Sequence, residues 1–441
     1  MDNIWHNWMG NLSCLPREIF RPTSLDDLRM IVNTAAKEGR CVRAFGSGHS
    51  WMPLVPTDDF LVDIRDMNRL LEIDPSAGTI RVEGGMTLGA LTAHAQRAGL
   101  AVQSPTVAIG FTVAGMIATG SAGTGMNVET FPDSVVSMTI VRADGEVVEV
   151  GEHDADMPFA RVALGTLGLI YSVTLRCPPA GNIRCETRKV PVEKLLTEMQ
   201  TIVKDHEAVM LMWYPYTKNA IVMLYDSTDE PLTFGPWQHR LFVLRQYIVE
   251  GFIGRPMLGL MVRVAPKLMP WPMRLTSALT RESVKVETQI DGVHWQYTYP
   301  AVWDSSWAVP IEDASDAWRA WMHELDDFAK RKIYPITMVM FARFLKGSQS
   351  PLSPDYGRAS CYVEATSLKP TPGVLDFYRR IEDIMISRFD ARPHWAKYFD
   401  DYERVRGQYG QRIVEAEKVR KRWDPDGRFL NPFLERMFGP R

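Results

Sequence analysis

Cysteines, clustered histidines and long apolar runs are scarce in this chain of 441 residues. The five cysteines are odd in number and include no Cys-x-x-Cys pair, which excludes a disulfide scaffold and favours reduced thiols. The nine histidines show no ligand spacing, so we predict no metal site. With 50 basic and 53 acidic residues the net charge is −3, which provides no field to hold nucleic acid.

Signals for export or membrane insertion are also missing. The N-terminus lacks the basic and apolar runs of a signal peptide, and no window holds 18 uncharged apolar residues. The most apolar segment, 241–275, is interrupted by charged residues and four prolines, which excludes a spanning helix. Two interpretations stay open for it: a flap on the protein's own surface, or an element in the membrane interface. We predict a cytoplasmic protein, with peripheral membrane contact as the alternative.

The patterns that are present predict an α+β fold. Ser24 and Asp27 form a capping box before an apolar helical stripe that Gly39 ends. Composition shifts near residue 179, after which most of the tryptophans and methionines occur. A long helix is expected at 314–332, and 295–299 reads as a strand with three aromatic side chains on one face. The other predicted strands are 41–45, 79–83, 135–141, 146–150, 169–175, 209–214 and 220–225.

Three glycine-rich turns dominate the first part of the chain, at 43–50, 110–125 and 163–168. Successive glycines let main-chain N–H groups converge on an anionic oxygen, because no Cβ blocks the approach. They do not form a dinucleotide fingerprint, since Trp51 stands where the third glycine belongs, and the chain has no P-loop.

The order and content of these turns resemble the FAD domain of vanillyl-alcohol-oxidase-type flavoproteins. Arg-x-x-Gly-x-Gly-His-Ser, Thr-x-Ala-Gly-x-x-x-Thr-Gly-x-x-Gly-Thr-Gly and Ala-Leu-Gly-x-Leu-Gly follow one another. Within that group the chain is most similar to the aldonolactone and alditol oxidases, because 392–397 reads Arg-Pro-His-Trp-Ala-Lys and 423–431 matches their closing motif. The resemblance implies a two-subdomain FAD-binding domain at 1–178, an α+β substrate (cap) domain on an antiparallel sheet at 179–388, and a C-terminal segment, 389–441, that returns to the FAD domain.

The resemblance also implies which residues bind the cofactor. The first turn would cradle the diphosphate, the second would line the second phosphate and the flavin, and the third would hold the adenine-ribose end. The implied FAD-binding residues are Arg43, Phe45, Gly46, Ser47, Gly48, His49, Ser50, Ser104, Pro105, Thr112, Gly115, Thr119, Gly120, Ser121, Gly123, Thr124, Gly125, Gly165, Gly168 and Ile170. In several members the histidine at the place of His49 bonds covalently to the flavin, and we expect the same here; a dissociable FAD beside His49 is the alternative.

Four residues are implied in catalysis. By family similarity, Arg343 and Lys397 would stabilise charge on the reduced flavin, and His394 would orient the substrate or accept its hydroxyl proton. Relatives carry Glu-x-Arg where this chain has Phe341 before Arg343, so the usual carboxylate is missing. Glu364, on a neighbouring predicted strand, is the candidate to replace it. A second departure is Ser121-Ala122, where relatives have a histidine, which leaves oxygen access open.

These residues predict an FAD-dependent oxidoreductase that oxidises a CH–OH group of an aldonolactone, alditol or related alcohol by hydride transfer to flavin N5. Oxygen or another acceptor would reoxidise the flavin. Phe341 and the many aromatic residues of the second region favour an alternative, an oxidase of a less polar or aromatic alcohol. A flavin-binding protein without turnover is the alternative from another functional class.

Overall fold

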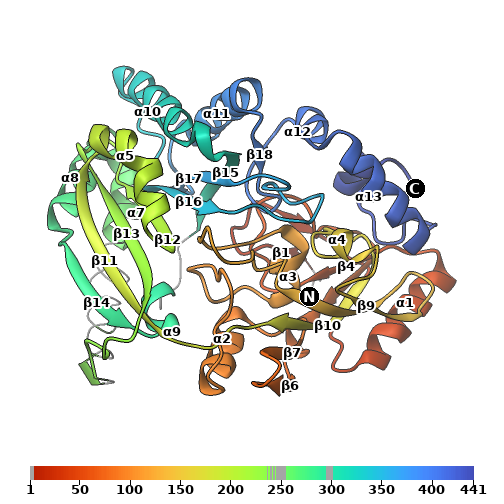
Figure 1. Ribbon diagram of the computed structural model, residues 1–441. Coiled ribbons are helices and arrows are strands. Elements are labelled where there is room, and N and C mark those ends of the chain that lie inside the picture. The colour runs from red at the N-terminus through yellow and green to blue at the C-terminus, as the bar shows by residue number, and fades with distance from the viewer. Residues whose placement is uncertain (1–3, 236, 239–240, 242–243, 245–254, 295–300) are drawn as a thin grey trace.

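The computed structural model describes residues 4–441 except 236, 239–240, 242–243, 245–254 and 295–300 (Figure 1). The described strands are β1 Trp5–His6, β2 Ser13–Cys14, β3 Glu18–Phe20, β4 Val42–Phe45, β5 Phe60–Asp63, β6 Leu70–Asp74, β7 Thr79–Glu83, β8 Val135–Val141, β9 Val147–Gly151, β10 Leu169–Arg176, β11 Asn182–Pro191, β12 Ala208–Trp213, β13 Asn219–Thr228, β14 Ser283–Glu287, β15 Val302–Pro310, β16 Val339–Leu345, β17 Ser360–Leu368 and β18 Arg392–Pro393. The described helices are α1 Leu25–Glu38, α2 Leu88–Arg97, α3 Val113–Thr119, α4 Met157–Ala160, α5 Val192–Asp205, α7 Arg255–Val264, α8 Pro270–Leu279, α9 Gln289–Val293, α10 Ala314–Lys330, α11 Val374–Phe389, α12 Tyr402–Tyr409, α13 Gln411–Trp423 and α14 Pro432–Phe438.

Two sheets form the N-terminal part of the molecule. A parallel sheet has the strand order β3-β5-β4, and an antiparallel sheet has the order β6-β7-β10-β8-β9. Helix α1 begins at the predicted capping box, in which Ser24 Oγ accepts from the Asp27 amide, and Gly39 ends it in the left-handed conformation. The predicted two-subdomain architecture is confirmed.

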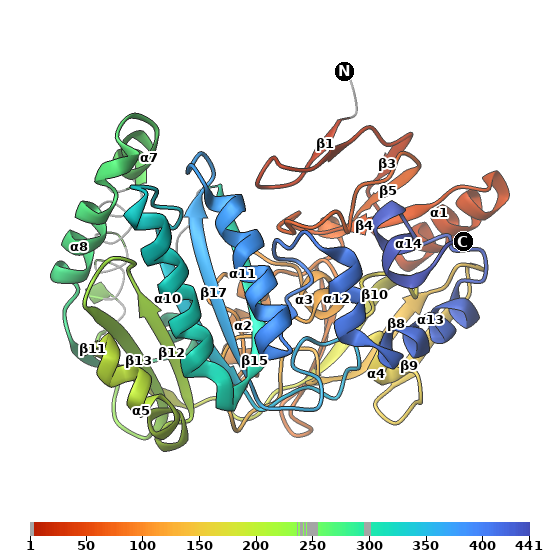
Figure 2. The ribbon, with the colours of Figure 1, turned by 90° about the horizontal axis from the view of Figure 1, so that it is seen from above.

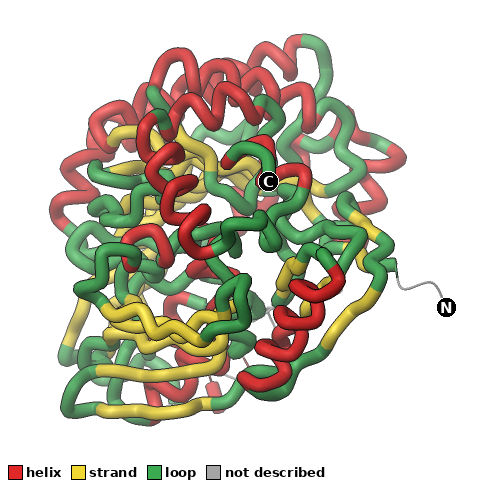
Figure 3. Tube along the Cα trace, turned by 90° about the vertical axis from the view of Figure 1, so that its right-hand side faces the viewer, coloured by secondary structure: helices red, strands yellow, loops and turns green. Residues whose placement is uncertain are grey.

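An eight-stranded sheet, in the order β14-β11-β13-β12-β16-β17-β15-β18, forms the second part. Helices α5, α10 and α11 cover one face, with α10 and α11 side by side (Figure 2), and Figure 3 shows a layer of helices over strands in the upper part of its view. Because side chains alternate along a strand, Ala342, Val363 and Trp307 enter the core under these helices. The neighbouring residues of the same strands point to the opposite face, where the candidate site lies.

The C-terminal segment joins both parts. Strand β18 pairs with β15, so the eight-stranded sheet extends beyond residue 388. The chain then returns to the N-terminal part, where Val419 and Trp423 enter the core of the five-stranded sheet and Phe429 enters the core around α1. This path is compatible with the predicted three segments, whose boundaries stay predictions.

Most expected elements occur within two residues of their predicted limits. The predicted helix 314–332 ends at Lys330, and the strand expected at 146–150 is shifted by one residue. The aromatic strand expected at 295–299 lies outside the described residues, as does most of 241–254. The remainder of that apolar segment forms α7 and α8. In the part of the chain that the structure describes, no helix combines the length and apolar character needed to cross a bilayer.

Candidate active site

A cavity of about 880 Å³ lies between the glycine-rich turns and the face of the eight-stranded sheet that the helices leave open. We call residues 45–50, 104–125 and 163–168 the glycine-loop wall. We call the opposite side, formed by β15, β16, β17 and the turn after β18, the sheet wall. All four predicted catalytic residues line the cavity, as do eighteen of the twenty predicted cofactor residues. The two that do not line it are Gly120 and Gly125.

Close packing of main chain explains why glycines form this wall. A Cβ added to Gly46 would lie 2.0 Å from Thr112 Oγ1, and one added to Gly123 would lie 2.2 Å from the Pro105 carbonyl oxygen. The Gly123 amide donates to the Ser104 carbonyl at 2.8 Å, which fixes two loops against each other. The wall therefore presents main-chain amides and small side chains to the cavity.

Arg43 lies behind the glycine-loop wall and holds its loops in place by hydrogen bonds. Its guanidinium donates to the carbonyls of Leu54, Leu164, Gly165 and Phe429. Burial lowers the pKa of Arg43 to about 10, a value that still leaves it charged at neutral pH. Since every guanidinium nitrogen donates to main chain, Arg43 connects the loops with the C-terminal segment, and a direct phosphate contact is not favoured.

His49 lies half-buried between two aromatic rings. Trp8 stacks on it with 4.8 Å between ring centroids, and Phe111 meets it edge-on at 5.1 Å. Burial, with a smaller repulsion from Lys397, lowers the pKa of His49 to about 4, so the imidazole is neutral at neutral pH. Its buried Nδ1 has no hydrogen-bond partner among the residues described.

Four charged side chains meet on the sheet wall. Arg343 Nη2 donates to Glu364 Oε2 at 2.9 Å, and Lys397 Nζ lies 3.5 Å from Glu364 Oε1. Lys397 also pairs with Asp304 Oδ2, and its ammonium lies 4.6 Å from the centroid of the Trp51 ring. The four residues form a continuous network of two cations and two carboxylates, largely withdrawn from solvent.

Strand register brings this network together. Glu364 on β17 lies directly opposite Phe341 on β16, and Arg343 is two residues further along β16. Asp304 on β15 pairs with Thr366, the next residue on the same face as Glu364. Lys397 enters from the turn after β18, whose path the Tyr398 amide fixes by donating to the Asp304 carbonyl at 2.9 Å. A carboxylate, that of Glu364, therefore lies directly across from position 341 on the facing strand.

The two carboxylates titrate differently. Burial raises the pKa of Asp304, and the charge on Glu364 raises it further against the attraction of Lys397. Burial also acts on Glu364, but the cations Lys397 and Arg343 outweigh it and hold the pKa of that carboxyl below its ordinary value. Burial would lower the pKa of Lys397, yet its two carboxylate neighbours keep it above normal. Of the two carboxylates, Asp304 is thus the more easily protonated.

His394 lies beside the network and contacts the glycine-loop wall. Its Nδ1 accepts from the Ala396 amide at 3.1 Å, so the proton of the neutral ring is on Nε2, which lies 3.3 Å from Ser121 Oγ. Ser121 Oγ lies 3.1 Å from Thr119 Oγ1. Burial, followed by repulsion from Lys397 and Arg343, lowers the pKa of His394 to about 3. This shift favours the orienting role predicted for His394 and disfavours the role of base.

Asp304 is the site residue that sequence reasoning missed. The residue is 3% exposed, and its buried Oδ1 has no hydrogen-bond partner in the described part of the chain. The only sequence signal was a lone acidic residue in an apolar strand, Val302-Trp-Asp-Ser-Ser-Trp-Ala-Val-Pro310. A buried carboxylate with one open oxygen at a cavity is a candidate proton acceptor.

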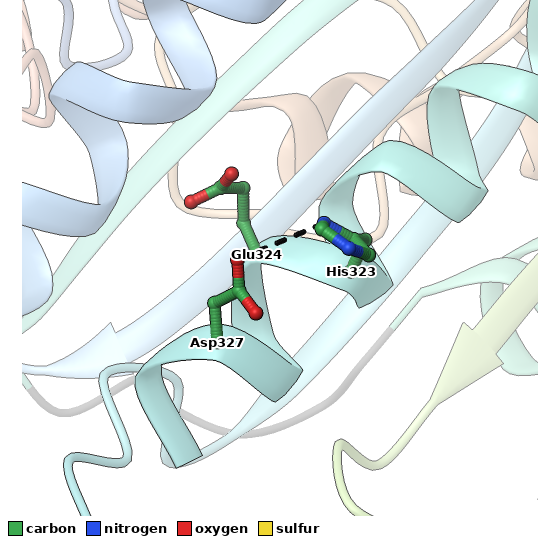
Figure 4. Close-up of side chains that lie close together, drawn as sticks. All are labelled: His323, Glu324 and Asp327. Atoms are coloured by element: carbon green, nitrogen blue, oxygen red, sulfur yellow. Dashed lines mark ion pairs between the residues drawn. The ribbon is translucent and has the colours of Figure 1, made fainter. Parts of the chain in front are cut away.

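Three residues of α10 have the composition of a metal site, and none of them lines the cavity. Among the described residues, His323, Glu324 and Asp327 place their ligand atoms within 4.8 Å of one another on α10 (Figure 4). Arg380 pairs with Glu324 at 3.1 Å, and Lys330 pairs with Asp327 at 2.7 Å. Since cations already occupy these carboxylates on an outer helix, the cluster supports no metal assignment.

Comparisons with known proteins agree with this geometry. The family model of D-arabinono-1,4-lactone oxidase matches residues 173–437, and that of the FAD-binding domain matches residues 16–151. The chain belongs to the D-arabinono-1,4-lactone oxidase family. An L-gulono-1,4-lactone dehydrogenase of Mycobacterium tuberculosis is 30% identical over 442 residues, 100% of both chains. An L-gulonolactone oxidase of Bos taurus is 28% identical over 98% of each chain.

A solved cholesterol oxidase from B. sterolicum has the same fold, with a TM-score of 0.82 and 16% identity over 99% of this chain and 97% of that one. The predicted family is confirmed, and the chain is an FAD-dependent oxidoreductase that acts on CH–OH groups. The alternative of a flavin-binding protein without turnover is thereby set aside. The site fits FAD, because glycines too crowded for a Cβ form one wall and an unpartnered buried imidazole nitrogen, in the part of the chain described, lies beside them.

Proposed function

We propose that the substrate is an aldonolactone and that one of its secondary hydroxyl groups is oxidised to a carbonyl. The named relatives are lactone oxidases and a lactone dehydrogenase. The observation that carries the proposal is the network of Asp304, Glu364, Arg343 and Lys397 on the sheet wall. A small polyhydroxylated lactone needs several donors and acceptors in a confined space, and this network supplies both.

Asp304 is the proposed base. Its buried Oδ1 has no hydrogen-bond partner in the described structure while Oδ2 is held by Lys397, so the carboxylate is oriented and keeps one oxygen for the hydroxyl proton. A raised pKa improves its match to a neutral working pH. Glu364, kept ionised by two cations, would accept hydrogen bonds from other substrate hydroxyls.

Arg343 and Lys397 are proposed to stabilise the negative charge that develops during the reaction. Arg343 is fixed by its bonds to the Ala122 and Gly123 carbonyls, and its charge centre lies 5.5 Å from the Tyr362 ring centroid. Both cations are therefore preorganised before substrate arrives. When bound, FAD supplies the hydride acceptor, at the glycine-loop wall.

His49 is proposed to hold FAD covalently. A neutral imidazole nitrogen is the form required for bond formation, and the low pKa of His49 provides it. Acid precipitation of the holoenzyme tests this: the flavin is expected to stay with the protein pellet and to fluoresce on a denaturing gel. Yellow colour left entirely in the supernatant would show a dissociable cofactor.

The substrate class is tested by anaerobic titration of the oxidised enzyme with aldonolactones, alditols and apolar alcohols. We expect the flavin absorbance to bleach with L-gulono-1,4-lactone or D-arabinono-1,4-lactone. Admission of oxygen, with hydrogen peroxide as readout, then separates reoxidation by oxygen from reoxidation by another acceptor. Failure of every lactone to bleach the flavin would contradict the proposal.

A second candidate substrate is a less polar alcohol, and Phe341 is the observation that favours it. Phe341 lines the cavity and packs in an apolar cluster with Met210, Tyr225 and Val339. In the same titration, bleaching by aromatic or alicyclic alcohols ahead of the lactones would establish this alternative.

For either substrate, we propose a cytoplasmic location. The unpaired state of the five cysteines agrees with a reducing compartment.

A further inference from the structure

The helix pair α7–α8 presents a large apolar surface to solvent. Seven apolar residues of the two helices and the turn between them are between 42% and 71% exposed: Met257, Leu260, Val264, Leu268, Trp271, Leu275 and Leu279. Spacings of three and four residues place those of each helix in one stripe. So many exposed apolar side chains on one helix pair are unusual on a protein that meets only water.

The opposite side of the pair is firmly anchored. Val262, Met269 and Met273 are buried in one cluster together with Trp51 and Leu368. Because these inward residues share a cluster, the exposed stripes of α7 and α8 lie on the same outer side. Figures 1 and 2 both place the pair at the end of the molecule opposite α13.

The charged residues between α7 and the end of α8 have one sign, and the first carboxylate after them is that of Glu282. Between residues 256 and 281 the charged residues are Arg263, Lys267, Arg274 and Arg281, all exposed, and the segment contains no aspartate or glutamate. An apolar stripe bordered by cations matches the interface of an anionic bilayer, where apolar side chains enter the acyl boundary and cations meet headgroup phosphates.

We propose that the α7–α8 face docks on an anionic phospholipid surface. A second copy of the chain is the less favourable occupant, because a two-fold contact would bring the four cations of each copy together. The geometry also links the face to the active site: Trp51, in the cluster beneath the pair, lies against the Lys397 ammonium. Docking would therefore place the catalytic network close to the membrane surface, whichever alcohol is oxidised.

Vesicle flotation of the FAD-loaded enzyme tests the proposal. We expect wild-type protein to float with vesicles of phosphatidylcholine and phosphatidylglycerol, to bind pure phosphatidylcholine weakly, and to be released by salt. Leu268→Glu/Trp271→Glu removes apolar area, and Arg263→Glu/Lys267→Glu reverses charge; each is expected to lower vesicle partitioning at least about tenfold. Arg274 is left unchanged because its guanidinium donates to the Tyr216 carbonyl.

Met30→Glu is the matched control, since Met30 on α1 is 59% exposed, as Trp271 is, and lies outside the face. It should float as wild type does, while thermal melting and flavin content confirm folding of all variants. Three results would overturn the proposal: no flotation with anionic vesicles, equal flotation with neutral ones, or flotation that both double variants retain. Light scattering that reveals a dimer, dissociated by the double variants, would assign the face to a second copy and overturn it as well.

Discussion

The two walls of the cavity use different parts of the polypeptide. The glycine-loop wall works through main chain that has no room for side chains, as the crowding at Gly46 and Gly123 shows. The sheet wall works through side chains whose charges are balanced across three strands and a turn. In the function that we propose, the first wall binds the cofactor and the second carries the substrate chemistry. Substitutions on the first wall should therefore reduce FAD content, and substitutions on the second should reduce turnover.

The largest effect is expected on the glycine-loop wall. Gly123→Ala places a Cβ against the Pro105 carbonyl, which must move with its loop. We expect FAD content to fall at least about 100-fold, measured by flavin absorbance of the purified protein. Gly407→Ala is the control, because nothing lies within 4 Å of its added Cβ. A yellow, fully loaded Gly123→Ala variant would refute the main-chain role of this wall.

Removal of Lys397 should produce the next largest effect, on turnover and not on cofactor. Lys397→Met leaves Asp304 and Glu364 with Arg343 as the remaining cation of the network. We expect kcat/KM to fall by about 10³ while FAD content stays near that of wild type. Lys421→Met, which removes an exposed lysine paired with Glu417, should leave both unchanged.

Asp304→Asn should reduce kcat by about 10² and change the pH profile. A protonated carboxyl cannot accept a proton, so wild-type activity should rise with pH through the Asp304 pKa, which lies above the ordinary aspartate range. We call this rise the acidic limb of the pH profile, and the residual activity of Asp304→Asn should lack it. Asp355 offers a control: burial raises its pKa to about 6, but it lies outside the cavity lining. If Asp355→Asn removes the limb and Asp304→Asn retains it, the assignment of the base is wrong.

The smallest effect tests whether the carboxylate can be exchanged across strands. Glu364→Gln should lower kcat/KM about tenfold, since a neutral amide replaces a charge that pairs with both cations. Because Phe341 lies opposite Glu364, Phe341→Glu/Glu364→Gln should recover part of that loss. Phe341→Glu alone should reduce activity, since two carboxylates would then face each other. Steady-state kinetics of the three variants form a double-mutant cycle, and additive losses would contradict the exchange.

The sequence predicted most cavity-lining residues of both walls, but it missed one charged member of the sheet wall, Asp304. A glycine-rich turn acts through local backbone, so its residues are neighbours in sequence, and most of them line the cavity. Gly120 and Gly125 do not, because they fix the ends of a helix and of a loop: Gly120 caps α3, and the Gly125 amide bonds to the Phe344 carbonyl.

Asp304 escaped prediction because its partners come from other strands. Its register against β17 and its contact with Lys397 depend on pairings that no local pattern specifies. Glu364 was reached through the strand pattern. Arg43 was predicted to bind the cofactor; it lines the cavity, and its guanidinium donates to the Leu54 and Leu164 carbonyls, which the sequence did not indicate.

The most direct test of the account is the single-turnover rate of flavin reduction by an aldonolactone, measured anaerobically in wild type and Asp304→Asn/Lys397→Met at equal flavin content. We predict that both proteins are fully loaded with FAD and that reduction in the double variant is slower by about 10³ or more. Reduction at the wild-type rate, or a loss of rate that merely follows a loss of bound flavin, would contradict it.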